Sequence, residues 1–214
     1  MVARLSEGRD LLRLATHDVH MRLHGHPVMR PLLDGCSDAP EYRRVLGHLF
    51  GFHAPLEHAL FAAGAWLPDA LGMDRRLRVA ALRRDLGDLG MGTAEIEALP
   101  LVRALPRLDS AGRALGALYV REGSTLGGKV MAARLDPLLG AGELSGRRFL
   151  NGDADAGSSW RSCCVVIETA AAQGQLADMV AGAQETFAAF EAWLDGVAGQ
   201  ATQEERRYVG HATP

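Results

Sequence analysis

The chain has 214 residues, of which 48% are hydrophobic and 23% are charged, a balance typical of a globular domain with a sizeable core. The formal charge is −3, so composition provides no general attraction for nucleic acid. The N-terminus lacks the apolar core of a signal peptide, and no run reaches the ~18 apolar residues that a membrane span needs. We therefore expect a cytoplasmic protein with neither a nucleic-acid partner nor a membrane partner.

The chain contains three cysteines, Cys36, Cys163 and Cys164. Their number is odd, two are adjacent, and no CxxC spacing occurs. This pattern predicts neither a disulfide framework nor a zinc knuckle, and it favours free thiols in a reducing compartment.

Apolar residues recur at helical spacing from the start of the chain, which predicts an amphipathic helix over residues 6–24. Asp38 and Pro40 have the pattern of a cap and first turn for a second helix. Pro55 should kink or split that helix, because a proline inside a helix removes a hydrogen bond. A third helix is predicted over residues 74–89.

The second half of the chain has the same helical period. Residues 91–108 are expected to form turns with one short helix. A long helix capped by Asp109 or Ser110 should then run to Leu135, where Pro137 ends it. The remaining expected elements are a loop over 139–159, helices over 160–172 and 178–196, and a polar, frayed tail.

No segment has the alternating pattern of a strand, and no internal repeat occurs. The sequence therefore predicts an all-α, single-domain bundle of antiparallel helices. We place the helical domain in residues 1–198 and the polar C-terminal tail in residues 199–214.

The stretch YVREGSTLGGKVMAARL, residues 119–135, is unusual for a helix because it holds three glycines, Gly123, Gly127 and Gly128. Each glycine costs a helix about 1 kcal/mol relative to alanine. Gly123 and Gly127 are four residues apart and share one face. Two interpretations remain open: another helix packs closely on this face, or a flat ligand such as a macrocycle lies against it. Spacing alone favours packing.

The predicted first helix presents His17, His20 and His24 on one face together with Arg13. A solvated histidine-rich face is the simplest interpretation, and His26 in the following turn is expected at the surface. A neutral imidazole is also a frequent metal ligand, and a single helical histidine can ligate a haem iron. Arg13, about two turns before His20, would then meet an anionic edge of the same ligand.

Three motifs together resemble the haem oxygenase family. ATHDVHMRLHGHPVMRPLLDG resembles its N-terminal helix, LYVREGSTLGGKV its distal helix, and SSWRSCCVVIE a late helix. The order and spacing of the motifs extend the resemblance over nearly the whole chain. It is closest to the bacterial branch that supplies biliverdin to bacteriophytochromes, and it implies a haem oxygenase-like multi-helix bundle.

The resemblance implies specific site residues. His20 matches the proximal iron ligand, and Thr16 lies one turn before it. Arg13 and Arg161 match basic residues that pair with haem propionates. The distal helix would contribute the residues that lie over the other haem face: Gly123, Ser124, Gly127 and Gly128.

The sequence departs from the family pattern at several positions. Ser124 stands where the best-studied branch has an aspartate that organises water. Leu118 stands where that branch has a tyrosine near a propionate, and Gly157 stands at the expected position of a second basic residue. Three further arginines have no assigned role: Arg121, Arg147 and Arg148.

The resemblance implies a monooxygenase that cleaves haem to biliverdin, carbon monoxide and ferrous iron. Haem would be both substrate and cofactor, dioxygen the oxidant, and a ferredoxin or flavoprotein reductase the electron donor. A bacteriophytochrome would be a recipient of the biliverdin.

Three other classes of protein remain as alternatives. Ser124 keeps open a haem or tetrapyrrole carrier without turnover. A non-haem metal oxidase would need several inward carboxylates, whereas the sequence offers only the adjacent Glu57 and His58. A helical interaction protein would explain the glycines but not Arg13, His20 and Arg161 together.

Overall fold

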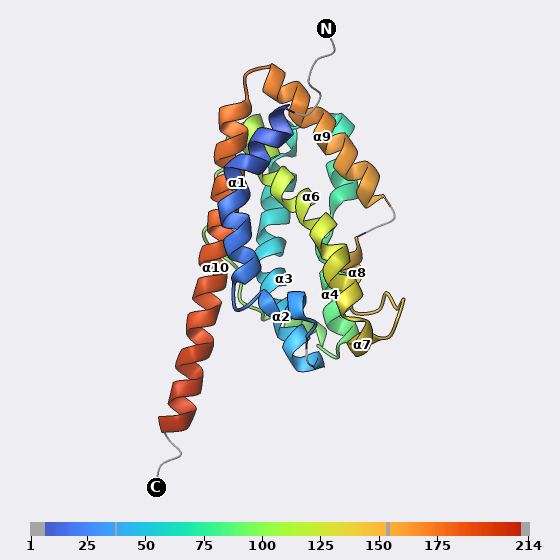
Figure 1. Cartoon of the computed structure of the whole chain (residues 1–214), viewed down its shortest axis with the longest axis vertical. Coiled ribbons are helices and arrows are strands. Elements are labelled where there is room, and N and C mark those ends of the chain that lie inside the picture. The colour runs from blue at the N-terminus through green and yellow to red at the C-terminus, as the bar shows by residue number, and fades with distance from the viewer. Residues whose placement is uncertain (1–6, 37, 153–154, 211–214) are drawn as a thin grey trace.

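The computed structural model describes residues 7–36, 38–152 and 155–210 (Figure 1). Within them the chain is helical and no strand is formed, which confirms the all-α prediction. The α-helices are α1 (Glu7–Gly25), α2 (Arg30–Asp34), α3 (Ala39–Ala62), α4 (Val79–Asp88), α5 (Thr93–Glu97), α6 (Ala111–Arg134), α7 (Asp136–Leu139), α8 (Arg148–Asn151), α9 (Ala156–Ala172) and α10 (Leu176–Gly210). Short 3₁₀ helices are η1 (Ala63–Trp66), η2 (Asp69–Leu71) and η3 (Met73–Arg76).

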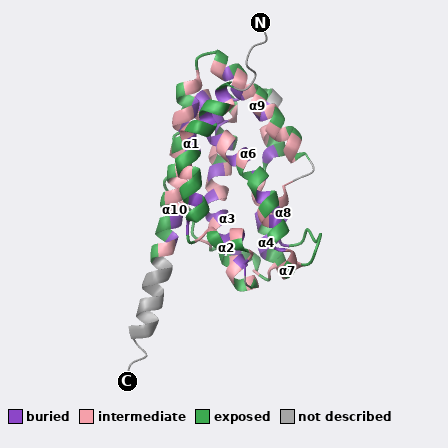
Figure 2. Cartoon of the chain, viewed as in Figure 1, coloured by how far each residue is buried: buried purple, intermediate pink, exposed green. Residues whose placement is uncertain are grey.

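Helix α6 runs through the middle of the molecule, with α1 and α10 side by side along one flank and α9 across one end (Figure 1). Two clusters of buried apolar residues form the core. One joins α1, α3, α6, α9 and α10, and the other joins α2, α3, α4, α8 and the end of α6. Both α3 and α6 contribute to the two clusters, so these helices connect the two halves of the bundle (Figure 2).

Several predicted boundaries are wrong. The prediction that Pro55 splits the second helix fails, because α3 continues to Ala62. The carbonyl of Gly51, which Pro55 leaves without a helical donor, accepts the N–H of Val102 at 2.9 Å instead. The helix expected over 74–89 is divided into η3 and α4.

The C-terminal part of the chain is more helical than expected. The predicted loop over 139–159 contains α8 and the first turn of α9. The last helix, expected to end near residue 196, continues to Gly210. The polar residues Gln, Glu and Arg of this segment are good helix formers, so polarity alone did not indicate a helix end. The last four residues of the predicted tail lie outside the described residues.

Helix α1 is held at its first turn by α9. The backbone amides of Gly8 and Arg9 donate to the Glu168 carboxylate at 2.9 and 3.0 Å. Amides in the first turn of a helix lack partners within the helix, so this carboxylate caps α1 from outside.

The other end of α1 is held by α10. Arg22 donates to Glu191 at 2.7 Å, and the His26 ring lies 3.3 Å from an Asp195 oxygen. His26 is only 9% exposed, so the expectation of a surface residue is wrong. The histidine face of α1 is therefore fixed from both ends.

Helix α6 approaches its neighbours closely at glycines. A Cβ at Gly112 would lie 2.5 Å from the Asp178 Cβ, and one at Gly116 would collide with the backbone of Met179. Gly182 on α10 meets the backbone of Arg113 in the same way. These contacts fix α6 against α10 at the end where the Ser110 hydroxyl caps the helix, accepting from the N–H of Arg113.

Among the described helices, none is long and apolar enough to cross a membrane.

Candidate functional site

A cavity of about 370 Å³ lies between α1, α3, α6 and α10. Its lining is mostly apolar, with aromatic side chains such as Phe52, Phe187 and Phe190. A pocket of this volume with few polar groups is typical of a site for a small, largely apolar ligand.

Six of the predicted site residues lie on the lining of this cavity. Three come from α1 and three from α6: Arg13, Thr16, His20, Gly123, Ser124 and Gly127. The structure therefore brings together two segments that are about a hundred residues apart in the sequence.

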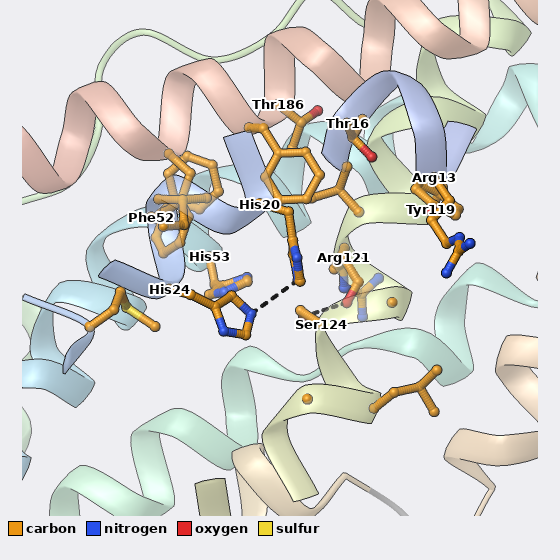
Figure 3. A pocket seen from close by; sticks show the side chains of 18 of the residues that line it. Arg13, Thr16, His20, His24, Phe52, His53, Tyr119, Arg121, Ser124 and Thr186 are labelled. Atoms are coloured by element: carbon orange, nitrogen blue, oxygen red, sulfur yellow. Dashed lines mark hydrogen bonds between the residues drawn. The ribbon is translucent and has the colours of Figure 1, made fainter. Parts of the chain in front are cut away.

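His20 presents its ring to the cavity (Figure 3). Its Nε2 lies 3.3 Å from the Nε2 of His24, and the Phe187 ring meets it edge-on at 6.1 Å between centroids. Burial lowers the pKa of His20, and the neighbouring His24 and His17 lower it further. The imidazole is therefore kept neutral near pH 7, the form that ligates a metal.

Thr16 and Arg13 lie on the same helix at increasing distance from His20. Thr16 is buried, and its hydroxyl donates to the Leu12 carbonyl at 2.8 Å within the helix. Arg13 is exposed at the end of the cavity near Tyr119 (Figure 3). Tyr119 in turn packs against Trp160, with ring centroids 5.7 Å apart. Arg13 can therefore meet an anionic group of a ligand at the cavity edge.

The glycines of α6 divide into two kinds. A Cβ at Gly123 would make only ordinary contact with Trp160 at 3.7 Å, and one at Gly127 would lie 3.8 Å from Met131. Both positions open into the cavity. A Cβ at Gly128 would instead lie 2.5 Å from the Leu150 carbonyl oxygen, so this glycine allows close packing of α8 on α6.

Two predicted residues thus lie away from the described cavity lining. Gly128 faces α8, and Arg161 lies on the exposed side of α9, directly after Trp160, which does line the cavity. Ser124 lines the cavity, and its hydroxyl donates to the Arg121 carbonyl at 2.7 Å (Figure 3). The lone pairs of that hydroxyl remain available to accept.

The sequence analysis missed His53, which lies on the α3 wall of the cavity. Its ring is surrounded by Phe52, Phe149 and Phe190, with centroids at 5.7, 5.0 and 6.3 Å. Burial, together with the positive charges of Arg78 and Arg121, lowers the pKa of His53 to about 3. No motif in the sequence surrounds this histidine, and its aromatic partners on α8 and α10 are distant in the chain.

Arg121, left without a role above, also lines the cavity. It is only 4% exposed, and its Nη2 has no hydrogen-bond partner among the described residues. Carboxylate oxygens of Glu57 and Glu122 lie 3.8 Å from its nitrogens, close enough to offset the charge but too far for hydrogen bonds. A buried, unsatisfied donor at a cavity wall is a candidate contact for a bound molecule.

The other two unassigned arginines have structural contacts. Arg147 donates to the Ala132 carbonyl and to Asp136, both at 2.6 Å, and so closes the end of α6. Arg148 pairs with Asp85 and Asp88. Neither arginine is needed to explain the cavity.

The family model described as heme oxygenase matches residues 7–196. The chain belongs to the haem oxygenase family. A relative named heme oxygenase, from Xanthomonas campestris pv. campestris (strain 8004), is 36% identical over 174 residues, which cover 78% of this chain and 96% of the relative. This haem oxygenase is accordingly an oxidoreductase that degrades haem with dioxygen.

The cavity of this haem oxygenase fits a haem. A neutral imidazole stands on α1, and the glycine backbone of α6 leaves room for a flat ring. The unpaired Nη2 of Arg121 and the aromatic walls provide one polar and several apolar contacts. The Glu57 carboxylate, which a non-haem metal oxidase would need as a metal ligand, instead accepts the N–H of Val79 at 3.1 Å and caps α4. The cavity therefore suits haem better than a carboxylate-bound metal.

Proposed function

We propose that this chain cleaves haem to biliverdin, carbon monoxide and ferrous iron in the cavity between α1 and α6. One observation carries the proposal: His20 on α1 and the open glycine face of α6 line the same apolar cavity. Bound haem supplies the iron that binds dioxygen and the ring that is oxidised. The chain supplies orientation, exclusion of water and placement of polar groups.

The proposed proximal side consists of His20 and its surroundings. His20 Nε2 would hold the haem iron, and the edge-on contact with Phe187 restricts the imidazole ring. The Thr16 hydroxyl donates to a carbonyl within α1, so this threonine contributes to the shape of the cavity wall and not to polar contacts with haem. Arg13 pairs with one propionate, and Arg161, adjacent to the cavity residue Trp160, pairs with the other from α9.

On the α6 side of the proposed haem site, the helix offers glycine backbone without side chains and few hydrogen-bond donors. Gly123 and Gly127 leave space for dioxygen beside the ring. Ser124 accepts a hydrogen bond from an ordered water, since its own proton is donated to the helix backbone. Arg121 and neutral His53 lie at the same cavity and give that water further partners. We assign Gly128 a packing role beneath this face.

We further propose a ferredoxin or a flavoprotein reductase as the electron donor and a bacteriophytochrome as a recipient of biliverdin. The sequence resemblance to the chromophore-supplying branch supports this choice. A cytoplasmic location is also proposed, and the free thiols of Cys36, Cys163 and Cys164 support it.

A carrier of haem or another tetrapyrrole remains the second candidate. Ser124 favours it, because a hydroxyl that already donates to Arg121 orders water less strongly than a carboxylate. The two candidates differ in what reductant and air do to the bound haem.

The deciding experiment adds one equivalent of hemin to the purified protein, and then a ferredoxin–reductase system or ascorbate in air. We expect a histidine-ligated Soret band that decays into the biliverdin absorption. A Soret band that is stable under reductant would support the carrier and contradict turnover.

The His20→Ala variant tests the ligand in the same assay. We expect loss of the imidazole–iron bond, and with it a changed Soret band and lost turnover. Added imidazole should restore the wild-type spectrum in part. An unchanged spectrum and unchanged turnover would remove His20 as the ligand.

A further inference from the structure

The His20–His24 pair has a geometry that haem binding does not explain. The two Nε2 atoms lie 3.3 Å apart, and the ring centroids are 4.5 Å apart at an interplanar angle of 57°. The edges of the rings that bear these nitrogens point toward one another across one turn of α1 (Figure 3). One ring can donate an N–H to the other at this distance, so two imidazole nitrogens of α1 already face each other directly.

The distance between the two Nε2 atoms matches the distance between two ligand atoms on one divalent cation. Two imidazole nitrogens about 2.0–2.1 Å from a tetrahedral zinc lie about 3.3–3.4 Å from each other. Histidines four residues apart on one helix face are an established way to present such a pair. The His20 and His24 nitrogens therefore stand at the spacing that a cation would impose.

The surroundings hold His20 and the helix that carries the pair. His20 is restricted by the edge of Phe187, and α1 is fixed to α9 through Glu168 and to α10 through Glu191. Preorganised ligands lose little freedom on binding, which favours affinity.

We propose that the haem-free protein binds one divalent first-row transition cation, such as Zn²⁺, between His20 Nε2 and His24 Nε2. Within the described part of the chain, no group of three or more histidine, cysteine, aspartate or glutamate side chains could hold a metal. The cation therefore has two protein ligands, and water from the cavity fills its other positions. An open site of this kind exchanges its metal, unlike a closed structural zinc site.

The cation and haem compete for one atom. His20 Nε2 cannot ligate the cation and the haem iron together, so each excludes the other. The cation site stands on the His20–His24 geometry alone, whereas the competition also rests on the proposed role of His20.

The test is a calorimetric titration of haem-free protein with ZnCl₂ in a buffer that does not chelate zinc. Wild type should bind one equivalent, and His24→Ala should bind about tenfold or more weakly, because one of two imidazole ligands is lost. His17→Ala is the matched control, since His17 lies on the same helix at the same cavity but outside the pair. It should bind zinc as wild type does. His24→Gln, which keeps a polar side chain, should repeat the His24→Ala result.

Two results would overturn the site: no saturable zinc binding by wild type, or equal affinity of wild type and His24→Ala. Because His24 is exposed, both variants should fold, and circular dichroism checks this. In a second titration, saturating Zn²⁺ should raise the apparent Kd of hemin for wild type but not for His24→Ala. If hemin does not bind at all, the proposed function fails, while the zinc titration still decides the cation site.

Discussion

Gly127 and Gly128 are neighbours in the sequence, yet their missing side chains have different consequences. Gly127 opens into the cavity, and a Cβ there would be in ordinary contact with Met131. Gly128 faces the backbone of Leu150. Of the two interpretations that the sequence left open, helix packing thus applies at Gly128, whereas Gly127 has the free space that the approach of a ligand would require.

We expect Gly127→Leu to weaken hemin binding by about tenfold or more, since filling a fitted space costs about 1–3 kcal/mol. The helix itself should tolerate the change, because leucine favours a helix over glycine by close to 1 kcal/mol. A hemin titration, with circular dichroism of the haem-free variant, measures both effects. Gly127→Ala is the control and should retain hemin binding. Normal binding and turnover in the leucine variant would show that no ligand approaches this backbone.

Individual site residues differ in how far the sequence could predict them. Helical spacing placed His20 and Arg13 on one face, but the resemblance to haem oxygenases was needed to single them out as site residues. His53 was not, because it comes from α3 and its surroundings are assembled from α8 and α10. Arg161 follows Trp160 on α9, and only the three-dimensional position shows which of these neighbours points to the cavity.

At the scale of elements, the contact between α6 and α8 depends on Gly128. A Cβ there would lie 2.5 Å from the Leu150 carbonyl oxygen, a backbone atom that cannot move alone. We predict that Gly128→Ala lowers the free energy of unfolding of the haem-free protein by about 1–3 kcal/mol, despite the better helix propensity of alanine. Urea unfolding measures the change.

Gly127→Ala again serves as the comparison, because it introduces the same methyl group one residue earlier, into open space. It should leave stability unchanged or raise it slightly. Equal stability of the two alanine variants would mean that α8 shifts freely and does not fix the distal helix.

The helices themselves were largely predictable, and the failures come from contacts with distant parts of the chain. Caps and periodicity located α1, α6 and the start of α3 to within a few residues. Pro55 does not split α3, and the Gly51 carbonyl that it leaves without a helical donor accepts from a distant backbone amide, that of Val102. The short helix α8 was missed because its amides are capped by Asp85, a residue of α4. Such contacts between distant segments leave no pattern in the local sequence.

For the whole molecule, His53 makes stability depend on pH. Its folded-state pKa is about 3, below the value near 6.5 of an exposed histidine. Between these values the unfolded chain binds more protons than the folded chain. The free energy of unfolding therefore falls as pH drops from 6.5 towards 3.

We predict that His53→Phe makes the haem-free protein less sensitive to acid. Phenylalanine suits the surrounding rings of Phe52, Phe149 and Phe190 and has no proton to gain. Between pH 6.5 and 5.0, wild type should lose about 2 kcal/mol more than the variant, since each pKa unit corresponds to 1.36 kcal/mol. Urea unfolding at several pH values measures this. Parallel pH profiles would show that folding does not lower the pKa of His53.

The two ends of α1 are held by carboxylates that come much later in the chain, Glu168 on α9 and Glu191 on α10. On the ribosome, the segment that carries His20 leaves the exit tunnel long before its anchors are synthesised. Domains complete their packing only when all of their parts have emerged. A nascent chain therefore carries an incomplete site for most of its synthesis, and the contacts that hold both ends of α1 form only after α10 has emerged.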